Sequence, residues 1–571
     1  MAPQLDLVIR GGQVVDGSGQ PGFTADVAIQ GGRIAKVGRV TEPAGRVIDA
    51  DGLTVTPGFI DIHTHYDAQL FFEPTASPSS WHGVTTVFTG NCGFTFAPSK
   101  PADLPWLLNM LSRVEGMSPE ALNAGVSFSG GSFGDFLHAL EGRIGVNLSA
   151  NVGHCSVRRW VMGEEASQRP ARDDEIAAMR ALVGQSINDG AAGFSSSQLA
   201  LHVDHEGRPV PSNLASPEEI ADLAGALAGI RGGAIEFIPE SFAIGYSDED
   251  RRLVGAMCRA SGKPVHLNTV TRLPHQPDGW RRALNFALEA AGRGEQVHPM
   301  FSTNRFSGLH FALATTFLFD EMPTFRSVLT RPSPDRERLL REGSVRDQLR
   351  SELTDTTGRS VTFSWESVRV SRVRDEAHAG WVGRTLADLG QEMGVGPFDA
   401  MLELSIAEEC QTDFVQERRV DPKAAEEARA VTEELIRSRV CMAGSSDGGA
   451  HILSFCGVDF PTRLLTEWVP EVLLFEEAVA RLTSVPAAVH GLTGRGVIQV
   501  GAAADLLLID RQGLGVGDTR FVSDFPAGTG RLVIDAHGYE ASIVNGEVLL
   551  QGGVHTGALP GQVLPPERGP G

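Results

Sequence analysis

Short apolar runs near both ends of the chain predict β-strands. Residues 5–9 and 26–29 are each followed by a glycine pair and then by a second apolar run. This pattern predicts two strand–glycine–strand hairpins, because glycine supplies the positive φ that short hairpin turns need. Near the other end, residues 504–509 predict a strand, and residues 543–550 carry an Asn545-Gly546 turn between apolar runs. The two ends therefore predict one small sheet built from both termini.

The middle of the chain alternates between strand and helix patterns. Residues 84–88, 147–152, 234–238 and 264–267 are short apolar runs typical of buried strands. One helix between them is expected to start at Ser216 as N-cap, with Pro217 first and Glu219 closing a capping box. Another is expected to start at Asp173. Repeated strand–helix units over about 400 residues predict an α/β fold, a (β/α)8 barrel.

These patterns divide the chain into two predicted domains. Residues 1–57 and 496–571 are expected to form a β-sandwich domain, and residues 58–495 the barrel. The strand–helix rhythm breaks between about 305 and 385, where a mixed-charge cluster follows Asp335. We expect an insertion or lid there.

Composition limits the partners. The 571 residues are 42% hydrophobic and 21% charged, with a net charge of −22, so the surface should repel nucleic acid and anionic membranes. No apolar run approaches the ~20 residues of a membrane helix, and the N-terminus does not resemble a signal peptide. The six cysteines lack paired spacing, which favours a reduced cytoplasmic protein. The expected partner is a small molecule, and a homo-oligomer stays open.

A His-x-His pair predicts metal chemistry. His63 and His65 end the apolar run 58–62, with Asp67 just beyond. Residues i and i+2 of a strand point to the same side, so both imidazoles can converge on one ion. Barrel enzymes place their active sites at the carboxyl ends of the strands, where this pair falls.

The motifs around this pair resemble a known family. PGFIDIHTHYDAQ (57–69) looks like the metal-binding start of the amidohydrolase superfamily, and TTVFTGNCGFTFAP (85–98) resembles its N-acyl-D-amino acid deacylase (D-aminoacylase) branch. Further similar stretches, including GSSDGGAH (444–451), extend nearly end to end. The resemblance implies a barrel beside a β-sandwich. It also implies hydrolysis of the amide C–N bond of an N-acyl amino acid, with one or two Zn²⁺ ions as cofactor.

The resemblance also implies roles for single residues. His63 and His65 would be metal ligands, and Cys92 a thiolate ligand after the second barrel strand. A thiolate is a good zinc ligand that metal binding deprotonates, although a buried cysteine can also be simple core filler. Asp447, at the exit of the last strand, would touch the metal and act as general acid and base. The alternative for Asp447 is a role in its glycine-rich turn.

Two strands depart from the family pattern. The family has histidines at the ends of strands five and six, but the fifth strand here holds Ile238 at about that position. Glu236 has the parity to face the barrel interior and is the candidate replacement ligand. His266 lies at an odd offset that turns it to the other face, and His298 lies about one unit further on. The number of metal ions therefore stays open.

The substrate contacts are less well defined by the sequence. His154, His202 and His451 each follow a predicted strand and are candidate substrate-binding residues. Four arginines are candidates for a substrate carboxylate, although a solvated surface position is the simpler expectation: Arg158, Arg159, Arg305 and Arg463.

Three alternatives compete with a metal-dependent deacylase. A cyclic amide hydrolase, of hydantoinase or dihydroorotase type, would share the metal chemistry but commonly uses a lysine carbamate. A non-catalytic ligand-binding pseudoenzyme could keep the fold without the missing histidines. A serine hydrolase is suggested by G-x-S-x-G at 130–134 and 444–448, a pattern that arises easily in a chain with 66 glycines.

Overall fold

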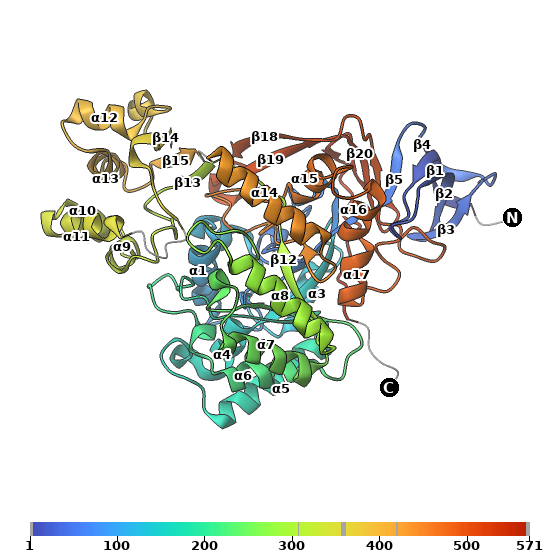
Figure 1. Ribbon diagram of the computed structural model, residues 1–571, viewed down its shortest axis with the longest axis horizontal. Helices are drawn as coiled ribbons and strands as arrows, with labels where there is room; N and C mark the ends of the chain where they lie inside the picture. The colour runs from blue at the N-terminus through green and yellow to red at the C-terminus, as the bar shows by residue number, and fades with distance from the viewer. Residues whose placement is uncertain (1–3, 307, 356–360, 418–420, 567–571) are drawn as a thin grey trace.

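The computed structural model describes residues 4–306, 308–355, 361–417 and 421–566. At its centre lies a sheet of eight parallel strands that follow one another in chain order (Figure 1). The strands are β6 (Phe59–Asp61), β7 (Val84–Thr89), β8 (Asn147–Gly153), β9 (Gly193–Ser197), β10 (Ala234–Ile238), β11 (Val265–Leu267), β12 (Val297–Phe301) and β16 (Met442–Ala443).

The sheet curls until its first and last strands meet. A parallel bridge joins Thr64, just after β6, to Gly448, after β16. The backbone N–H of His65 donates to the Gly448 carbonyl at 2.7 Å. All seven strand pairings are parallel, so every carboxyl end opens onto the same rim. The predicted (β/α)8 barrel is confirmed, and the loops after its strands share one face.

Helices connect the strands and cover the outside of the barrel (Figure 1). They are α1 (Leu104–Glu115), α2 (Pro119–Gly125), α3 (Phe133–Leu140), α4 (His154–Met162), α5 (Asp173–Asp189), α6 (Pro217–Ala224), α7 (Asp248–Ser261), α8 (Gly279–Gly292), α14 (Pro422–Arg437), α15 (Phe460–Glu467), α16 (Phe475–Leu482) and α17 (Ser484–His490). The predicted starts of α5 and α6 are confirmed.

The predicted capping box of α6 is half formed. The Ser216 hydroxyl accepts the backbone N–H of Glu219 at 3.2 Å, as expected of an N-cap. The Glu219 carboxylate instead binds His154 and Arg158, both buried in α4. The Glu219 carboxylate stabilises the protein more by pairing with these two buried side chains than by accepting a backbone N–H at the start of the helix. A buried charge without a partner costs far more free energy than an uncapped backbone group.

The two termini form one nine-stranded sheet, as predicted. From the N-terminal side come β1 (Leu5–Val14), β2 (Phe23–Gln30), β3 (Arg33–Gly38), β4 (Ala44–Asp49) and β5 (Thr54–Pro57). From the C-terminal side come β17 (Leu506–Ile509), β20 (Tyr539–Val544), β21 (Glu547–Gln551) and β22 (Val554–His555). A separate pair, β18 (Gly515–Val522) with β19 (Arg531–His537), stands outside this sheet.

One predicted hairpin in this sheet is wrong. The Gly31-Gly32 and Asn545-Gly546 turns do connect antiparallel partners, β2 with β3 and β20 with β21. At Gly11-Gly12, however, β1 continues, and its pairing with β2 shifts register between Ile9 and Gly12. The glycines make a bulge there because the chain on both sides stays paired with the same strand.

The break in rhythm corresponds to a projecting lobe. The described part of this lobe contains a three-stranded sheet and five α-helices, drawn largely in yellow at the left of Figure 1. These are β13 (Gly308–Phe311), β14 (Arg369–Arg372), β15 (Asp413–Glu417), α9 (Pro323–Leu329), α10 (Asp335–Arg341), α11 (Gly343–Thr354), α12 (Leu386–Met393) and α13 (Pro397–Ala407). Its hydrophobic cluster is separate from that of the barrel and extends to Phe414, past the expected end at 385.

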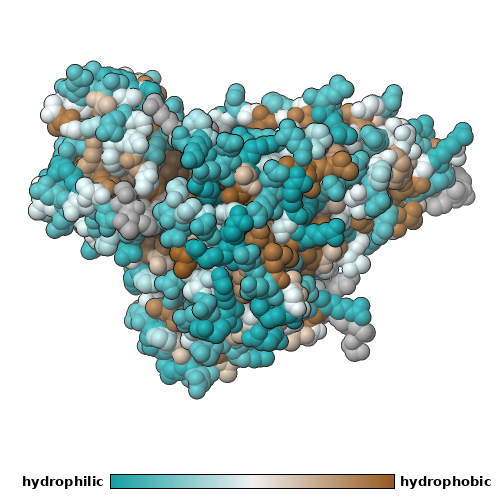
Figure 2. All heavy atoms as spheres, viewed as in Figure 1, coloured by the Kyte–Doolittle hydropathy of each residue, from teal (hydrophilic) through white to brown (hydrophobic). Residues whose placement is uncertain are grey.

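Parts of the predicted domains lie outside the described residues: 1–3 and 567–571 of the terminal domain, and 307 and 356–360 of the insertion. Among the described helices, none is both long and apolar enough to cross a membrane. Hydrophilic side chains dominate the face seen in Figure 2.

Candidate metal centre

Three predicted ligands converge at the carboxyl ends of the first two barrel strands. Ligand atoms of His63, His65 and Cys92 all lie within 4.8 Å of one another, and all three side chains are buried. Cys92 Sγ is 3.5 Å from His63 Nε2 and 3.9 Å from His65 Nε2. Two imidazoles and a thiol directed at one point form a donor set suited to zinc.

The turn that carries Cys92 is built by its neighbours. Asn91 Nδ2 donates to the carbonyls of Thr64 and Phe88, both at 3.0 Å, which ties the turn to the exit of the first strand. Cys92 itself has φ of 56°. A Cβ at Gly93 would lie 3.3 Å from Cα of Ser196, so only glycine fits easily beside the neighbouring strand. The Asn-Cys-Gly motif is thus a device for aiming the thiol at His63 and His65.

Asp447 approaches this cluster from the loop after β16, which lies beside the end of β6 where the barrel closes. Its Oδ1 is 3.2 Å from His63 Nε2, and its side chain is 27% exposed, so it faces both the cluster and open space. Burial works to raise the pKa of Asp447, but the contact with His63 outweighs it and leaves that pKa below its usual value. A Cβ at Gly449 would meet the His65 carbonyl at 2.7 Å, so the glycine lets this loop close over the first strand.

Glu236 faces the interior, as its parity predicted. It accepts the backbone N–H of Cys92 at 2.5 Å, and its other oxygen is 3.6 Å from His63 Nδ1. Burial raises the pKa of Glu236 to about 7 and, together with the Glu236 charge, raises the pKa of the Cys92 thiol. A buried thiol among carboxylates is stabilised as a thiolate only by a cation, so the residues present fit a metal ion.

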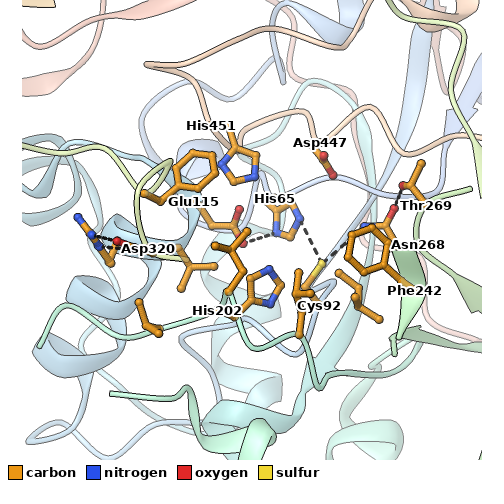
Figure 3. Close-up of a pocket in the computed structure, with 17 residues that line it drawn as sticks. His65, Cys92, Glu115, His202, Phe242, Asn268, Thr269, Asp320, Asp447 and His451 are labelled. Atoms are coloured by element: carbon orange, nitrogen blue, oxygen red, sulfur yellow. Dashed lines mark hydrogen bonds and ion pairs between the residues drawn. The ribbon is translucent and has the colours of Figure 1, made fainter. Parts of the chain in front are cut away.

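Glu115, at the end of α1, has a position that the sequence did not indicate. Its Oε1 is 3.1 Å from His65 Nδ1, and the two side chains are 2% and 3% exposed. A carboxylate is the usual outer partner of a metal-ligating histidine. Placed at Nδ1, it fixes the ring so that Nε2 is directed at the metal position. Glu115 therefore orients His65 toward Cys92 (Figure 3).

A pocket opens beside the cluster and brings several predicted residues together. His65, Cys92, Asp447, His202 and His451 all line it (Figure 3). His202 Nδ1 is 2.8 Å from the Ser197 hydroxyl, and burial lowers the pKa of His202 to about 3. Burial also lowers the pKa of His451. Both rings are neutral at pH 7 and can donate or accept hydrogen bonds in the pocket.

His154 does not join this group. It is fully buried behind the pocket wall, with Nδ1 2.8 Å from the Ser196 hydroxyl and Nε2 2.8 Å from Glu219. The four candidate arginines also lie away from the pocket, each held by an acidic partner. The pairs are Arg158–Glu219, Arg159–Asp103, Arg305–Glu467 and Arg463–Asp459.

The histidines of strands six and seven are turned away from the cluster. His266 stacks on His490 with ring centroids 4.6 Å apart, and His298 Nδ1 is 3.0 Å from the Val440 carbonyl. The odd offset of His266 predicted this orientation. Asn268, just after β11, takes the inward position in place of His266. Its Nδ2 is 3.2 Å from His63 Nε2.

Several pocket residues escaped the sequence reasoning. Asn268 could have been found, because polar residues at the exits of barrel strands face the site. Arg113, Glu115 and the lobe residues Phe317 and Asp320 carried no such signal. They stand in a helix or a lobe whose contacts depend on the whole fold.

The two G-x-S-x-G matches do not form nucleophiles. The Ser446 hydroxyl hydrogen-bonds with Asp61, and the Ser132 hydroxyl caps α3 and bonds with Asp135. Among the residues that the structure describes, no histidine side chain pairs with either serine, as one would with an activated serine.

Comparison with known proteins agrees with this geometry. The family model described as "Amidohydrolase family" matches residues 46–307 and 368–550. The N-acyl-D-aspartate deacylase of Alcaligenes xylosoxydans xylosoxydans is 30% identical over 99% of this chain and 95% of its own. The D-aminoacylase of the same organism is 29% identical over 98% of this chain and 97% of its own.

A solved structure has the same fold. The N-acyl-D-glutamate deacylase of Bordetella bronchiseptica, crystallised with zinc and a phosphonate inhibitor, matches 99% of this chain and 100% of its own. The TM-score is 0.65 at 24% sequence identity. Because the family model covers well over half of the residues and a full-length relative is 30% identical, this chain belongs to the amidohydrolase family.

Proposed function

We propose that this amidohydrolase hydrolyses the amide C–N bond of an N-acyl-D-amino acid, with one or two zinc ions as cofactor. The observation that carries the proposal is the convergence of His63, His65 and Cys92 beside a pocket that Asp447 also lines. The names of the full-length relatives support the substrate class, and the zinc in the Bordetella structure supports the metal.

The donor set favours zinc over harder ions. His63, His65 and Cys92 supply nitrogen and sulfur, with Asp447 and Glu236 as neighbouring carboxylates. Soft thiolate ligands select zinc, whereas magnesium and calcium prefer oxygen. When bound, the ion would polarise the amide carbonyl and lower the pKa of a water molecule.

Asp447 is the residue that we assign to proton transfer. Its carboxylate has a lowered pKa, so at neutral pH it is ionised and can accept a proton at Oδ from the attacking water. The same carboxyl then donates that proton to the leaving amine nitrogen. His202 and His451 line the same pocket and are the proposed substrate contacts. We withdraw His154 from that role because Ser196 and Glu219 already occupy both of its ring nitrogens.

The alternatives have less support. A cyclic amide hydrolase with a carbamylated lysine would need a lysine at the metal, and no described lysine lines the pocket. Lys263, the buried one, donates to main-chain carbonyls at residues 230 and 231. A pseudoenzyme would have no need to keep two imidazoles, a thiol and an ionised carboxylate around one point.

We further propose that the protein works in the cytoplasm. All six cysteines are free, and five of them are buried, as expected of a chain that folds under reducing conditions. A native mass measurement tests whether the protein forms a homo-oligomer.

A substrate screen tests the function. The purified protein, reconstituted with zinc, would be incubated with N-acetyl derivatives of D- and L-amino acids, and release of the free amine would be followed. We expect turnover of D-substrates and its loss on chelation. The Asp447→Asn variant keeps the shape of the side chain but not the proton acceptor, so kcat should fall about 10²–10⁴-fold while KM moves little.

Two results would count against the proposal, the first against the function and the second against the role of Asp447. One is absence of turnover on every N-acyl amino acid by protein that has bound zinc stoichiometrically. The other is an Asp447→Asn variant that keeps more than about a tenth of the wild-type kcat, which would assign proton transfer to another group.

A further inference from the structure

The pocket contains one cationic side chain among its described lining residues. This is Arg113 of α1; the other charged groups that line the pocket are the carboxylates of Glu115, Asp320 and Asp447. An N-acyl amino acid with an acidic side chain carries two carboxylates. The α-carboxylate, which every N-acyl amino acid carries, is left to the neutral donors His202 and His451. The second carboxylate would need Arg113, or would stay without a cationic partner in a closed space.

Arg113 is already paired. Its Nε donates to Asp320 Oδ2 at 3.1 Å, and its Nη2 donates to Asp320 Oδ1. The side chains are 7% and 1% exposed, so solvent does not screen the pair. A two-pronged contact uses the fork of the guanidinium that would otherwise bind a substrate carboxylate. Arg113 is thus occupied in the substrate-free protein.

The partner of Arg113 comes from the lobe, not from the barrel. Asp320 and Phe317 stand between β13 and α9, inside the stretch 308–367 that the family model does not match. The Phe317 ring lies 4.4 Å from His451, centroid to centroid, so the same segment also covers a pocket histidine. Asp320, which neutralises Arg113, and Phe317, which covers His451, therefore belong to a segment outside the part of the barrel that the family model matches.

Beside the neutral polar residues His202, His451, Asn268 and Thr269, part of the pocket wall is apolar. Leu199, Leu201 and Val203 follow β9, Ile238 is the last residue of β10, and Phe242 follows β10. Apolar walls of this kind stabilise an apolar side chain by removing it from water. They offer no hydrogen bond to a carboxylate, whose burial without a partner is strongly unfavourable.

We propose that Asp320 of the lobe acts as a specificity residue: by occupying Arg113 it makes the pocket select N-acyl amino acids with uncharged, apolar side chains and reject acidic ones. The proposal rests on the deacylase function proposed above. It separates this chain from its 30% identical relative, which is named for an acidic substrate.

The test compares two substrates on three proteins. N-acetyl-D-leucine and N-acetyl-D-aspartate would be assayed with zinc-loaded wild type, Asp320→Asn and Glu409→Gln. The control removes one negative charge from the same lobe, at the exposed Arg374–Glu409 pair. We expect the wild type and control to favour leucine by at least about 100-fold in kcat/KM, the scale on which a pocket rejects a group that it leaves unpaired. Asp320→Asn frees the arginine and should raise kcat/KM for aspartate by at least about tenfold.

A double variant separates a freed arginine from a loosened pocket. Arg113→Met with Asp320→Leu replaces the buried pair by apolar side chains, a change that buried ion pairs often tolerate. The double variant should keep the preference for N-acetyl-D-leucine, and its kcat/KM for N-acetyl-D-aspartate should not exceed that of the wild type. A gain on aspartate in the double variant would overturn the role of Arg113, because no cation would remain to explain it.

Binding measurements distinguish the two proposals. Calorimetric titration with the same N-acetyl amino acids does not depend on turnover. One outcome is that no substrate is hydrolysed, that N-acetyl-D-leucine binds more tightly than N-acetyl-D-aspartate, and that Asp320→Asn reduces this difference in affinity. The deacylase function then fails and the pocket inference stands. If the wild type prefers aspartate, or Asp320→Asn leaves the ratio unchanged, the pocket inference is overturned even when deacylation occurs.

Discussion

Glu115 offers a sharp test of how the metal centre is held together. Its carboxylate oxygen lies 3.1 Å from His65 Nδ1, and the side chains of Glu115 and His65 are 2% and 3% exposed. If this contact orients His65, weakening it should lower zinc affinity without removing any ligand. The change is made in two steps: Glu115→Gln keeps the size and a neutral acceptor, and Glu115→Ala removes both.

The expected magnitude follows from the burial of the pair. The contact is a buried ion pair, since the 3.1 Å separation is not accompanied by hydrogen-bond geometry at His65 Nδ1. Loss of an outer partner of a ligating histidine commonly weakens metal binding by about 10–100-fold, and each tenfold change in Kd corresponds to about 1.4 kcal/mol. We therefore expect the zinc Kd to rise about tenfold in Glu115→Gln and toward 100-fold in Glu115→Ala.

The assay is zinc competition with a chromophoric chelator, read beside circular dichroism to show that the barrel is intact. Glu141→Gln is the matched control, because Glu141 Oε2 is 3.3 Å from His138 Nδ1 in an exposed pair on the surface. Its zinc Kd should equal that of the wild type. A Glu115→Ala protein that is folded and binds zinc as tightly as the wild type would refute the positioning role.

Three further predictions follow from the site and the core. Changing both His63 and His65 to Ala should abolish zinc binding and turnover, measured by metal analysis and amine release, while circular dichroism stays that of a folded barrel; residual stoichiometric zinc would contradict the ligand assignment. Cys92→Ser should weaken zinc binding at least tenfold, because a hydroxyl replaces a soft thiolate, and unchanged zinc content would favour core filler. Burial lowers the pKa of His490 from 6.5 to about 3. The unfolded chain therefore takes up the proton first as the pH falls below 6.5, and native stability should drop by about 2 kcal/mol between pH 7 and pH 5 from this ring alone. Urea unfolding of wild type and His490→Phe at both pH values measures the contribution of His490 to the pH dependence of stability. Equal pH dependence in the two proteins would contradict this contribution.

Much of this protein follows from short-range sequence pattern. The apolar runs at 84–88 and 234–238 predicted β7 and β10, because a strand buried on both faces needs a continuous apolar run. His63 and His65 could be singled out from their spacing at the end of a strand, and Cys92 and Asp447 from the resemblance to a known family. Each stands just after a predicted strand, and the barrel topology brings all such exits to one rim.

The remaining contacts were decided only when distant segments packed together. Glu219 fits a capping box by its spacing, yet its carboxylate serves His154 and Arg158, because burying those two groups without a partner would be costlier than leaving a helix end to other partners. Glu115 and His65 are 50 positions apart, and Arg113 and Asp320 are 207 apart. Nothing local distinguishes these residues from surface charges. Burial removed the solvent that would otherwise have paired them, and the tertiary fold placed a partner of opposite charge beside each.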